Sequence, residues 1–178
     1  LTLSGNGVKT APSGTLTVKG DLVKSGTSTF AHNSGLVLLS GGNQNFAGLP
    51  YNSLTVTNTS TSTKTLVGDG SITDALTLGG TNTTLAIGSN VLTLKSSSTL
   101  TARVAPLPAS ANITYTSSTL GKFKVERYLP MDLSGNYTSR RWRLMGLPVS
   151  TTGAPTIKEA WQEGGTGLTT TAAYPSGP

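Results

Sequence analysis

Carboxylates are the side chains that would do chemistry on a glycan, because glycoside cleavage needs paired acids or a calcium ion held by oxygen ligands. The 178 residues contain only seven of them: Asp21, Asp69, Asp74, Glu126, Asp132, Glu159 and Glu163. No two share an equivalent position in the repeat described below. Asp21, Asp69 and Asp74 stand near turns, where we expect them to bond backbone groups two residues on. The sequence therefore assigns no catalytic residue, and we predict that the chain is not an enzyme.

A cation or cofactor site has equally little support. Segment 68–74 holds Asp69, Asp74 and hydroxyl side chains, but its acidic density is below that of a calcium-binding loop, so calcium there stays open and no metal is assigned. His32 is the only histidine and has no carboxylate near it in sequence, so we interpret it as a polar turn residue. The glycine-rich segment 164–167 lacks the Lys of a phosphate-binding loop. We expect no cofactor.

The amino-acid composition indicates which type of secondary structure the chain forms. The chain has 31 Thr, 21 Ser and 22 Gly, whereas 11% of its residues are charged, 35% are hydrophobic and none is Cys. Thr is stiff at its first side-chain torsion and suits the solvated face of a strand, while Ser and Gly favour turns. A long-helix protein, a disulfide scaffold and a thiolate metal site are thereby excluded. The composition predicts an all-β fold.

One strand pattern returns along the chain, an apolar-Thr-apolar run followed by Gly, Ser or Asn. Its first leucines are spaced by 20, 18, 22 and 16 residues: Leu16, Leu36, Leu54, Leu76 and Leu92. Weaker strands are expected between these copies, around Phe30, Phe46, Leu66, Leu85 and Leu100. A period near 20 with two short strands per repeat is typical of a solenoid, in which stacking of successive turns supplies the core. We predict a parallel β-solenoid with Leu, Val, Ile and Phe inward and Thr and Ser outward. The alternative is an antiparallel β-sandwich, which normally joins its strands by tight Asn-Gly or Asp-Gly hairpins.

The chain divides into three predicted parts. Residues 1–104 are solenoid coils, 105–150 are a capping or appended β-unit, and 151–178 are a short helical turn and loop, in what reads as a fragment of a longer chain. Segment 122–149 is basic and aromatic, and we expect it to cover the open end of the solenoid, where an unpaired ladder would otherwise invite aggregation. Phe123, Val125, Trp142 and Leu144 should pack inward, with Lys122, Lys124, Arg141 and Arg143 in water.

Charge and surface chemistry exclude some partners. The net charge of +6 is concentrated in residues 103–143 and follows an ordinary alternating strand pattern, so we expect no nucleic acid partner. No apolar run is long enough for a membrane-spanning helix. Thr-x-Thr pairs such as Thr15/Thr17 and Thr55/Thr57 would suit an ice-binding face, but the leucine-anchored copies carry two, one or no Thr, so ice binding is the weakest alternative.

Two runs of residues carry a family resemblance. They are Val-Glu-Arg-Tyr-Leu-Pro at 125–130 with Arg-Arg-Trp-Arg-Leu at 140–144, and Gly-Gly-Asn-Gln-Asn-Phe-Ala-Gly at 41–48. The chain resembles, over about residues 35–165, segments of very large secreted and cell-surface proteins of Bacteroidota. The resemblance implies export by the type IX secretion system and an adhesin or structural role at the outer membrane. A connection with gliding motility is also what the resemblance implies.

These observations predict a non-enzymatic structural or adhesive segment, located extracellularly or on the cell surface. Its expected partners are the type IX secretion machinery during export and a surface glycan or another cell-surface protein. The main alternative is a carbohydrate-binding or carbohydrate-active β-helix module.

Overall fold

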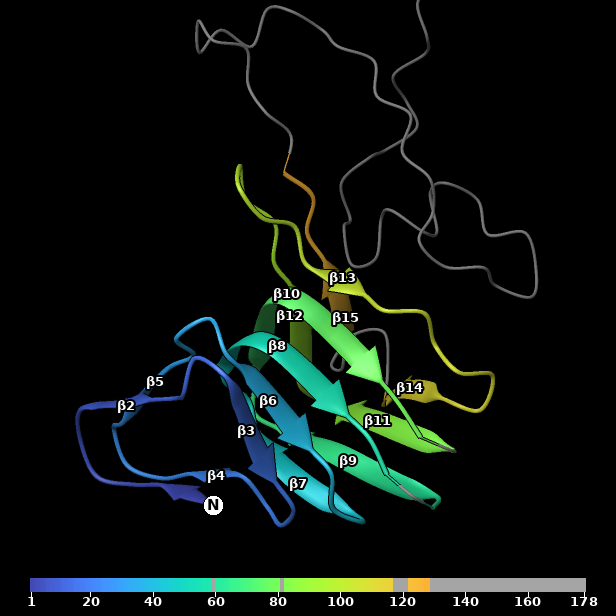
Figure 1. Ribbon diagram of the computed structural model, residues 1–178, viewed down its shortest axis with the longest axis horizontal. Coiled ribbons are helices and arrows are strands. Elements are labelled where there is room, and N and C mark those ends of the chain that lie inside the picture. Colours follow the sequence, from blue (N-terminus) through green and yellow to red (C-terminus); the bar gives the residue numbers. More distant parts are fainter. Residues whose placement is uncertain (59, 81, 117–121, 129–178) are drawn as a thin grey trace, which may run out of the picture. The chain divides into compact units, whose positions relative to one another are not determined.

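The computed structural model describes residues 1–58, 60–80, 82–116 and 122–128, which belong to one compact unit, Leu1–Pro130. These residues form strands and no helix (Figure 1). The strands are β1 (Thr2–Leu3), β2 (Val8–Thr10), β3 (Thr15–Val18), β4 (Val23–Lys24), β5 (Thr29–Ala31), β6 (Leu36–Leu39), β7 (Gln44–Ala47), β8 (Pro50–Val56), β9 (Ser62–Val67), β10 (Gly70–Leu78), β11 (Thr83–Gly88), β12 (Val91–Leu94), β13 (Arg103–Val104), β14 (Asn112–Tyr115) and β15 (Lys122–Val125). The helical turn expected within 151–178 lies outside the described residues, as do Trp142 and Leu144 and Arg141 and Arg143.

All pairings between these strands are parallel, and each joins residues from successive turns of the chain. The larger sheet has the order β15-β12-β10-β8-β6-β3, with β13 beside β10, and a second sheet has the order β14-β11-β9-β7. Figure 1 shows β3, β6, β8 and β10 stacked side by side above β7, β9, β11 and β14. The predicted parallel β-solenoid is confirmed, and the antiparallel sandwich is wrong.

The core follows the predicted alternation of side chains. In the larger sheet, Leu16, Val37, Leu54 and Leu76 are successive partners in the ladder, and Val18, Leu39, Val56 and Leu78 form a second inward column. On the facing sheet Phe46 pairs with Leu66. Tyr51 lies fully buried with its ring 6.0 Å from Phe30 and 6.4 Å from Phe46, and its hydroxyl donates to the carbonyl of Ala47. Burial raises the pKa of that hydroxyl. Outward positions on these strands are mostly Thr and Ser, as predicted, and Asn45 also faces outward.

Two of the predicted repeat positions are wrong. Leu92 does not continue the column of Leu76, because β12 pairs with the first part of β10, where Leu92 lies beside Gly70. The second part of β10 is followed in the ladder by β13, with Leu76 beside Val104. Between β12 and β13 the chain makes a small hairpin closed by the antiparallel bridge of Ser96 and Thr101. The expected strand around Leu100 is the tip of this hairpin, and Leu100 is exposed.

The parallel ladders continue beyond Val104. β14 pairs with β11, and β15 pairs with β12, which places Phe123 beside Leu92 and Val125 beside Leu94. Phe123 and Val125 pack against the core as expected, while Lys124 is exposed and Lys122 is half-buried. The first strand of segment 122–149 is therefore a further rung of the larger sheet.

Candidate functional site

The carboxylates at the turns join one turn of the solenoid to the next. Asp21 Oδ1 accepts a hydrogen bond of 2.8 Å from the backbone N–H of Asn45, and Asp69 Oδ1 accepts one of 2.8 Å from that of Val91. The expected bonds to backbone groups two residues on are not the ones that form, because in a solenoid the next turn presents an amide closer to the carboxylate. Both side chains act as fixed acceptors in the stack.

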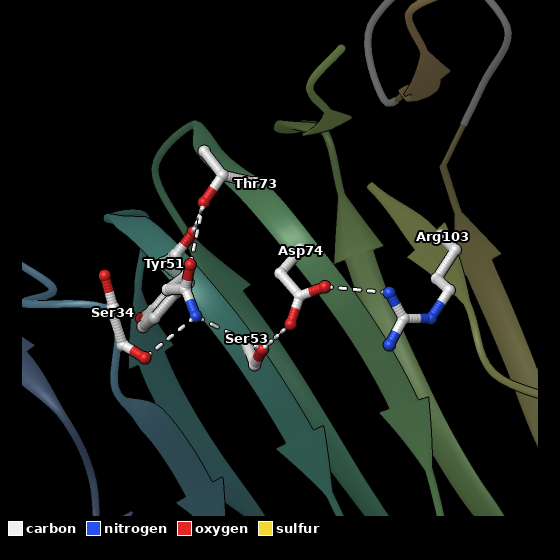
Figure 2. Close-up of polar contacts among 7 residues, drawn as sticks. Ser34, Tyr51, Ser53, Thr73, Asp74 and Arg103 are labelled. Carbon is white, nitrogen blue, oxygen red and sulfur yellow. Dashed lines mark hydrogen bonds and ion pairs between the residues drawn. The ribbon is translucent and has the colours of Figure 1, made fainter. Parts of the chain in front are cut away.

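A row of polar side chains runs across the outside of the larger sheet, near the bend within β8 and β10. We call it the outer polar row, and it consists of the side chains of Asn52, Ser53, Thr73, Asp74 and Arg103 and the backbone carbonyl of Ser34 (Figure 2). Asp74 is its centre: the Ser53 hydroxyl donates to Oδ2 at 2.8 Å, and Arg103 Nη1 lies 2.8 Å from Oδ1. Three successive turns thus meet at one carboxylate.

The remaining members of the outer polar row, Asn52 and Thr73, each bond to a backbone carbonyl of the turn before their own. The side-chain amide of Asn52 donates to the carbonyl of Ser34 at 3.0 Å, and the Thr73 hydroxyl lies 3.3 Å from the Tyr51 carbonyl, to which it donates. Ser34 has a positive φ of 55°, a conformation that non-glycine residues rarely adopt, and its N–H donates to His32 Nδ1 at 3.0 Å. His32 is therefore a turn residue, as predicted, and the row is a set of satisfied contacts between turns.

Asp69 and Asp74 belong to separate contacts, which bears on the calcium question left open above. Asp69 is bound to the Val91 amide, and Asp74 is shared by Ser53 and Arg103. The Arg103 guanidinium occupies the place of a cation at Asp74. Within the described part of the chain, no three His, Asp or Glu side chains gather closely enough to hold a metal ion.

Glu126 is the last of the acidic residues that the structure describes, and it too links turns. Its Oε1 lies 2.8 Å from Lys95 Nζ, and Oε2 accepts a bond from the backbone N–H of Ser96. The hydrogen bond from Lys95 lowers the pKa of Glu126. Both side chains are largely exposed, so this pair contributes little to stability.

A second cluster lies inside the solenoid, at the turns that enter β7, β9 and β11. We call it the polar corner, and its buried side chains are Gln44, Asn58, Ser62, Lys64 and Thr83. Lys64 is fully buried and directs its ammonium to the carbonyls of Gly41 and Gly42 and to the Ser62 hydroxyl. Burial lowers the pKa of Lys64.

The remaining members of the polar corner satisfy one another. Gln44 donates to the Val18 carbonyl at 3.0 Å and accepts from the Gly41 N–H at 2.9 Å. Asn58 donates to Ser62 at 2.6 Å and accepts from the Thr83 hydroxyl at 2.8 Å. Gly41 is required here, because a Cβ on it would lie 1.8 Å from the Lys19 carbonyl of the preceding turn. Sequence reasoning missed this cluster, although a Lys between two Thr in a strand places its side chain opposite to theirs and was a usable signal.

Comparisons with known proteins found no match among protein-family models, curated proteins or solved structures. In the described residues there is no helix of the length and apolar character that crossing a bilayer requires.

Proposed function

We propose that this chain is a non-enzymatic structural or adhesive segment of a large secreted or cell-surface protein, exported by the type IX secretion system. The single observation that carries the proposal is the use of the carboxylates. All four acidic side chains in the described residues, Asp21, Asp69, Asp74 and Glu126, accept hydrogen bonds from another turn of the solenoid. A carboxylate that is held by an amide, hydroxyl or guanidinium of another turn links the two turns. Such a carboxylate is poorly placed to exchange protons with a substrate.

The stacked architecture suits a spacer or an adhesive stalk. Each turn is bonded to the next by a parallel ladder and packs its aliphatic side chains against its neighbours, so the stack resists bending without disulfides. The resemblance to Bacteroidota surface proteins supports the extracellular location and the secretion route. On this proposal the secretion machinery is the partner during export, and a surface glycan or another cell-surface protein is the partner afterwards.

Location is the property that tests the proposal most directly. An epitope tag can be placed in the exposed tip of the hairpin between β12 and β13, at Ser97, without interrupting a ladder. In the source bacterium, antibody should label the tagged full-length protein on intact cells, and inactivation of the type IX system should abolish that labelling while the protein is retained inside. Labelling that requires lysis in both strains would overturn the proposal.

Activity separates this proposal from its carbohydrate-active alternative. The purified chain should release no reducing ends from a panel of soluble and insoluble polysaccharides. Release of reducing ends by the wild type that is lost in Asp74→Asn would make the outer polar row a catalytic site and contradict the non-enzymatic assignment.

A further inference from the structure

The outer surface of the sheet β7-β9-β11-β14 carries a regular array of small polar side chains. The ladder pairings place Thr63, Thr84 and Asn112 in one column, and Asn45, Thr65, Ala86 and Thr114 in the next. We call these seven residues the Thr/Asn face. Their neighbours in each strand, among them Lys64, Leu66 and Leu85, point into the core, so all seven side chains share the outer side of the sheet.

The array has the two fixed spacings of a parallel sheet. Side chains two residues apart on one strand are about 6.6 Å apart, and those on neighbouring strands are about 4.8 Å apart. Thr63 and Thr65 on β9 and Thr84 and Ala86 on β11 therefore form a near-rectangular lattice, which Asn45 and Asn112 extend on either side. In the described residues, the hydroxyls of Thr63, Thr65 and Thr84 donate to no protein group. Thr63 bonds to the Asn43 side chain through its backbone N–H.

The Thr/Asn face is free of charge in a chain of net charge +6. Lys64 is the one charged residue in the four strands, and its ammonium is buried in the polar corner on the opposite side of the sheet. Val67 on β9 and Tyr115 on β14, which border the face, are exposed and uncharged. One charge borders it at the β7 end, where the exposed Asp21 lies beside Asn45 and accepts a hydrogen bond from the Asn45 backbone N–H. Protein surfaces are ordinarily covered by mixed charges, so an uncharged face of this extent matches an uncharged contact partner.

The larger sheet lacks this regularity. Its outward column through Thr17, Thr55 and Thr77 is interrupted by Leu38, and the column of Thr15 and Ser53 is interrupted by Leu36. The bend of that sheet also carries the Asp74–Arg103 ion pair. The two sheets therefore form a built-in comparison. Both expose Thr, and in the sheet β7-β9-β11-β14 no large apolar or charged side chain interrupts the array of Thr, Asn and Ala.

We propose that the Thr/Asn face binds ice. Four of the seven positions are Thr, and each Thr offers a hydroxyl and a methyl group. A methyl group orders water around it, while the hydroxyl bonds to that water. Water held at these two spacings resembles the rows of oxygen atoms on ice crystal surfaces, which are uncharged and periodic in two dimensions. The seven positions include no aromatic side chain, so they lack the platform on which a sugar ring commonly stacks. The inference is independent of the secretion route proposed above.

Ice adsorption tests this inference with two matched variants of the whole chain. Thr65→Lys puts a long, charged side chain at the centre of the Thr/Asn face, and Thr55→Lys puts the same side chain on the outer surface of β8. We expect the wild type and Thr55→Lys to shape ice crystals, to show thermal hysteresis and to partition into a slowly growing ice front. Thr65→Lys should lose these properties while keeping the same thermal melting curve.

Three outcomes would overturn the inference. They are a wild type without ice adsorption, an equal loss in both variants, and an unchanged Thr65→Lys. Retention of the wild type, but not of Thr65→Lys, on insoluble cellulose or chitin without any ice adsorption would assign the same face to a neutral polysaccharide instead. Failure of ice binding leaves the surface-labelling result untouched, so the two proposals fail separately.

Discussion

The two sheets of the solenoid place charge on opposite sides. The larger sheet has a purely aliphatic interior along Leu54, Leu76 and their partners, and it carries the Asp74–Arg103 pair on its outer surface. The sheet β7-β9-β11-β14 buries its one charge, Lys64, in the polar corner and exposes none. Because the same alternation shapes both sheets, the difference lies in which strand positions received the charged residues. The larger sheet keeps its charged side chains on the side that faces water. The sheet β7-β9-β11-β14 has its one charged side chain on the side that faces the core.

Removing a core leucine of the larger sheet should have the largest effect on stability. Leu76 is fully buried between Leu54 and Val104, so Leu76→Ala should lower the free energy of unfolding by about 3–5 kcal/mol, the range for a large cavity in a packed core. Thr77→Ala on the same strand points outward and should change it by less than about 0.5 kcal/mol. Urea unfolding measures both. Equal losses in the two variants would refute the inward and outward assignment of β10.

Removing the whole buried side chain of Lys64 should have the next largest effect. Lys64→Ala deletes a fully buried stem and leaves the carbonyls of Gly41 and Gly42 without their donor, so we expect a loss of about 2–4 kcal/mol. Lys64→Met keeps most of the stem and should lose clearly less in the same urea titration. A Met variant as unstable as the Ala variant would show that the ammonium, and not the packing of the stem, is what the polar corner requires.

The same residue predicts a dependence of stability on pH. Burial lowers the pKa of Lys64 in the folded protein, so between that lowered value and the ordinary 10.5 the unfolded chain binds more protons than the folded protein. The free energy of unfolding should therefore rise with pH through this window. Below the window Lys64 is protonated in both states, so it adds no pH dependence there. Unfolding titrations from about pH 7 to about pH 10 should show the rise in wild type and its loss in Lys64→Met. An identical slope in both proteins would contradict the burial of this charge.

The outer polar row should matter less, because water reaches it. Asp74→Ala removes the acceptor of the Ser53 hydroxyl and the partner of Arg103, and we expect a loss of about 1 kcal/mol. Arg103→Gln should lose about half as much, since its guanidinium is mostly exposed. A double-mutant cycle of Asp74→Ala with Ser53→Ala measures the coupling between them. Additive losses would mean that the contact contributes nothing to stability.

The smallest effect is expected at Glu126. The hydrogen bond from Lys95 lowers the pKa of Glu126 below its ordinary 4.5, so its contribution to stability is present above pH 4.5 and is lost as the pH falls through the lowered pKa. Glu126→Gln should flatten the acid side of the stability profile slightly, and high salt should produce the same flattening in wild type. A profile that is unchanged by both would show that the pair does not form in solution.

The strand pattern could be read from the sequence because each strand obeys a local rule. Leu54 and Val56 alternate with Ser53, Thr55 and Thr57, and this period of two predicts the inward and outward faces without knowledge of any partner. The partners themselves were not predictable in this way. The bonds of Asp21 and Asp69 reach amides 24 and 22 residues away, which no local turn rule specifies.

The sequence by itself thus determined the β content, the spacing of the strands near 20 residues and the side of each strand that faces the core. Only the tertiary structure decided which strands are equivalent. Leu16 pairs with Val37 and Leu54 with Leu76, at nearly equal intervals, whereas Leu76 is followed by Val104 and Leu94 by Val125, at longer ones. β12 and β13 both pair with β10, and the hairpin between them separates Leu92, beside Gly70, from Val104, which takes the place next to Leu76. A count along the chain therefore assigns Leu92 to the wrong column. Register in a solenoid is fixed by hydrogen bonds between turns, and these depend on where each turn closes and not on the number of residues that it contains.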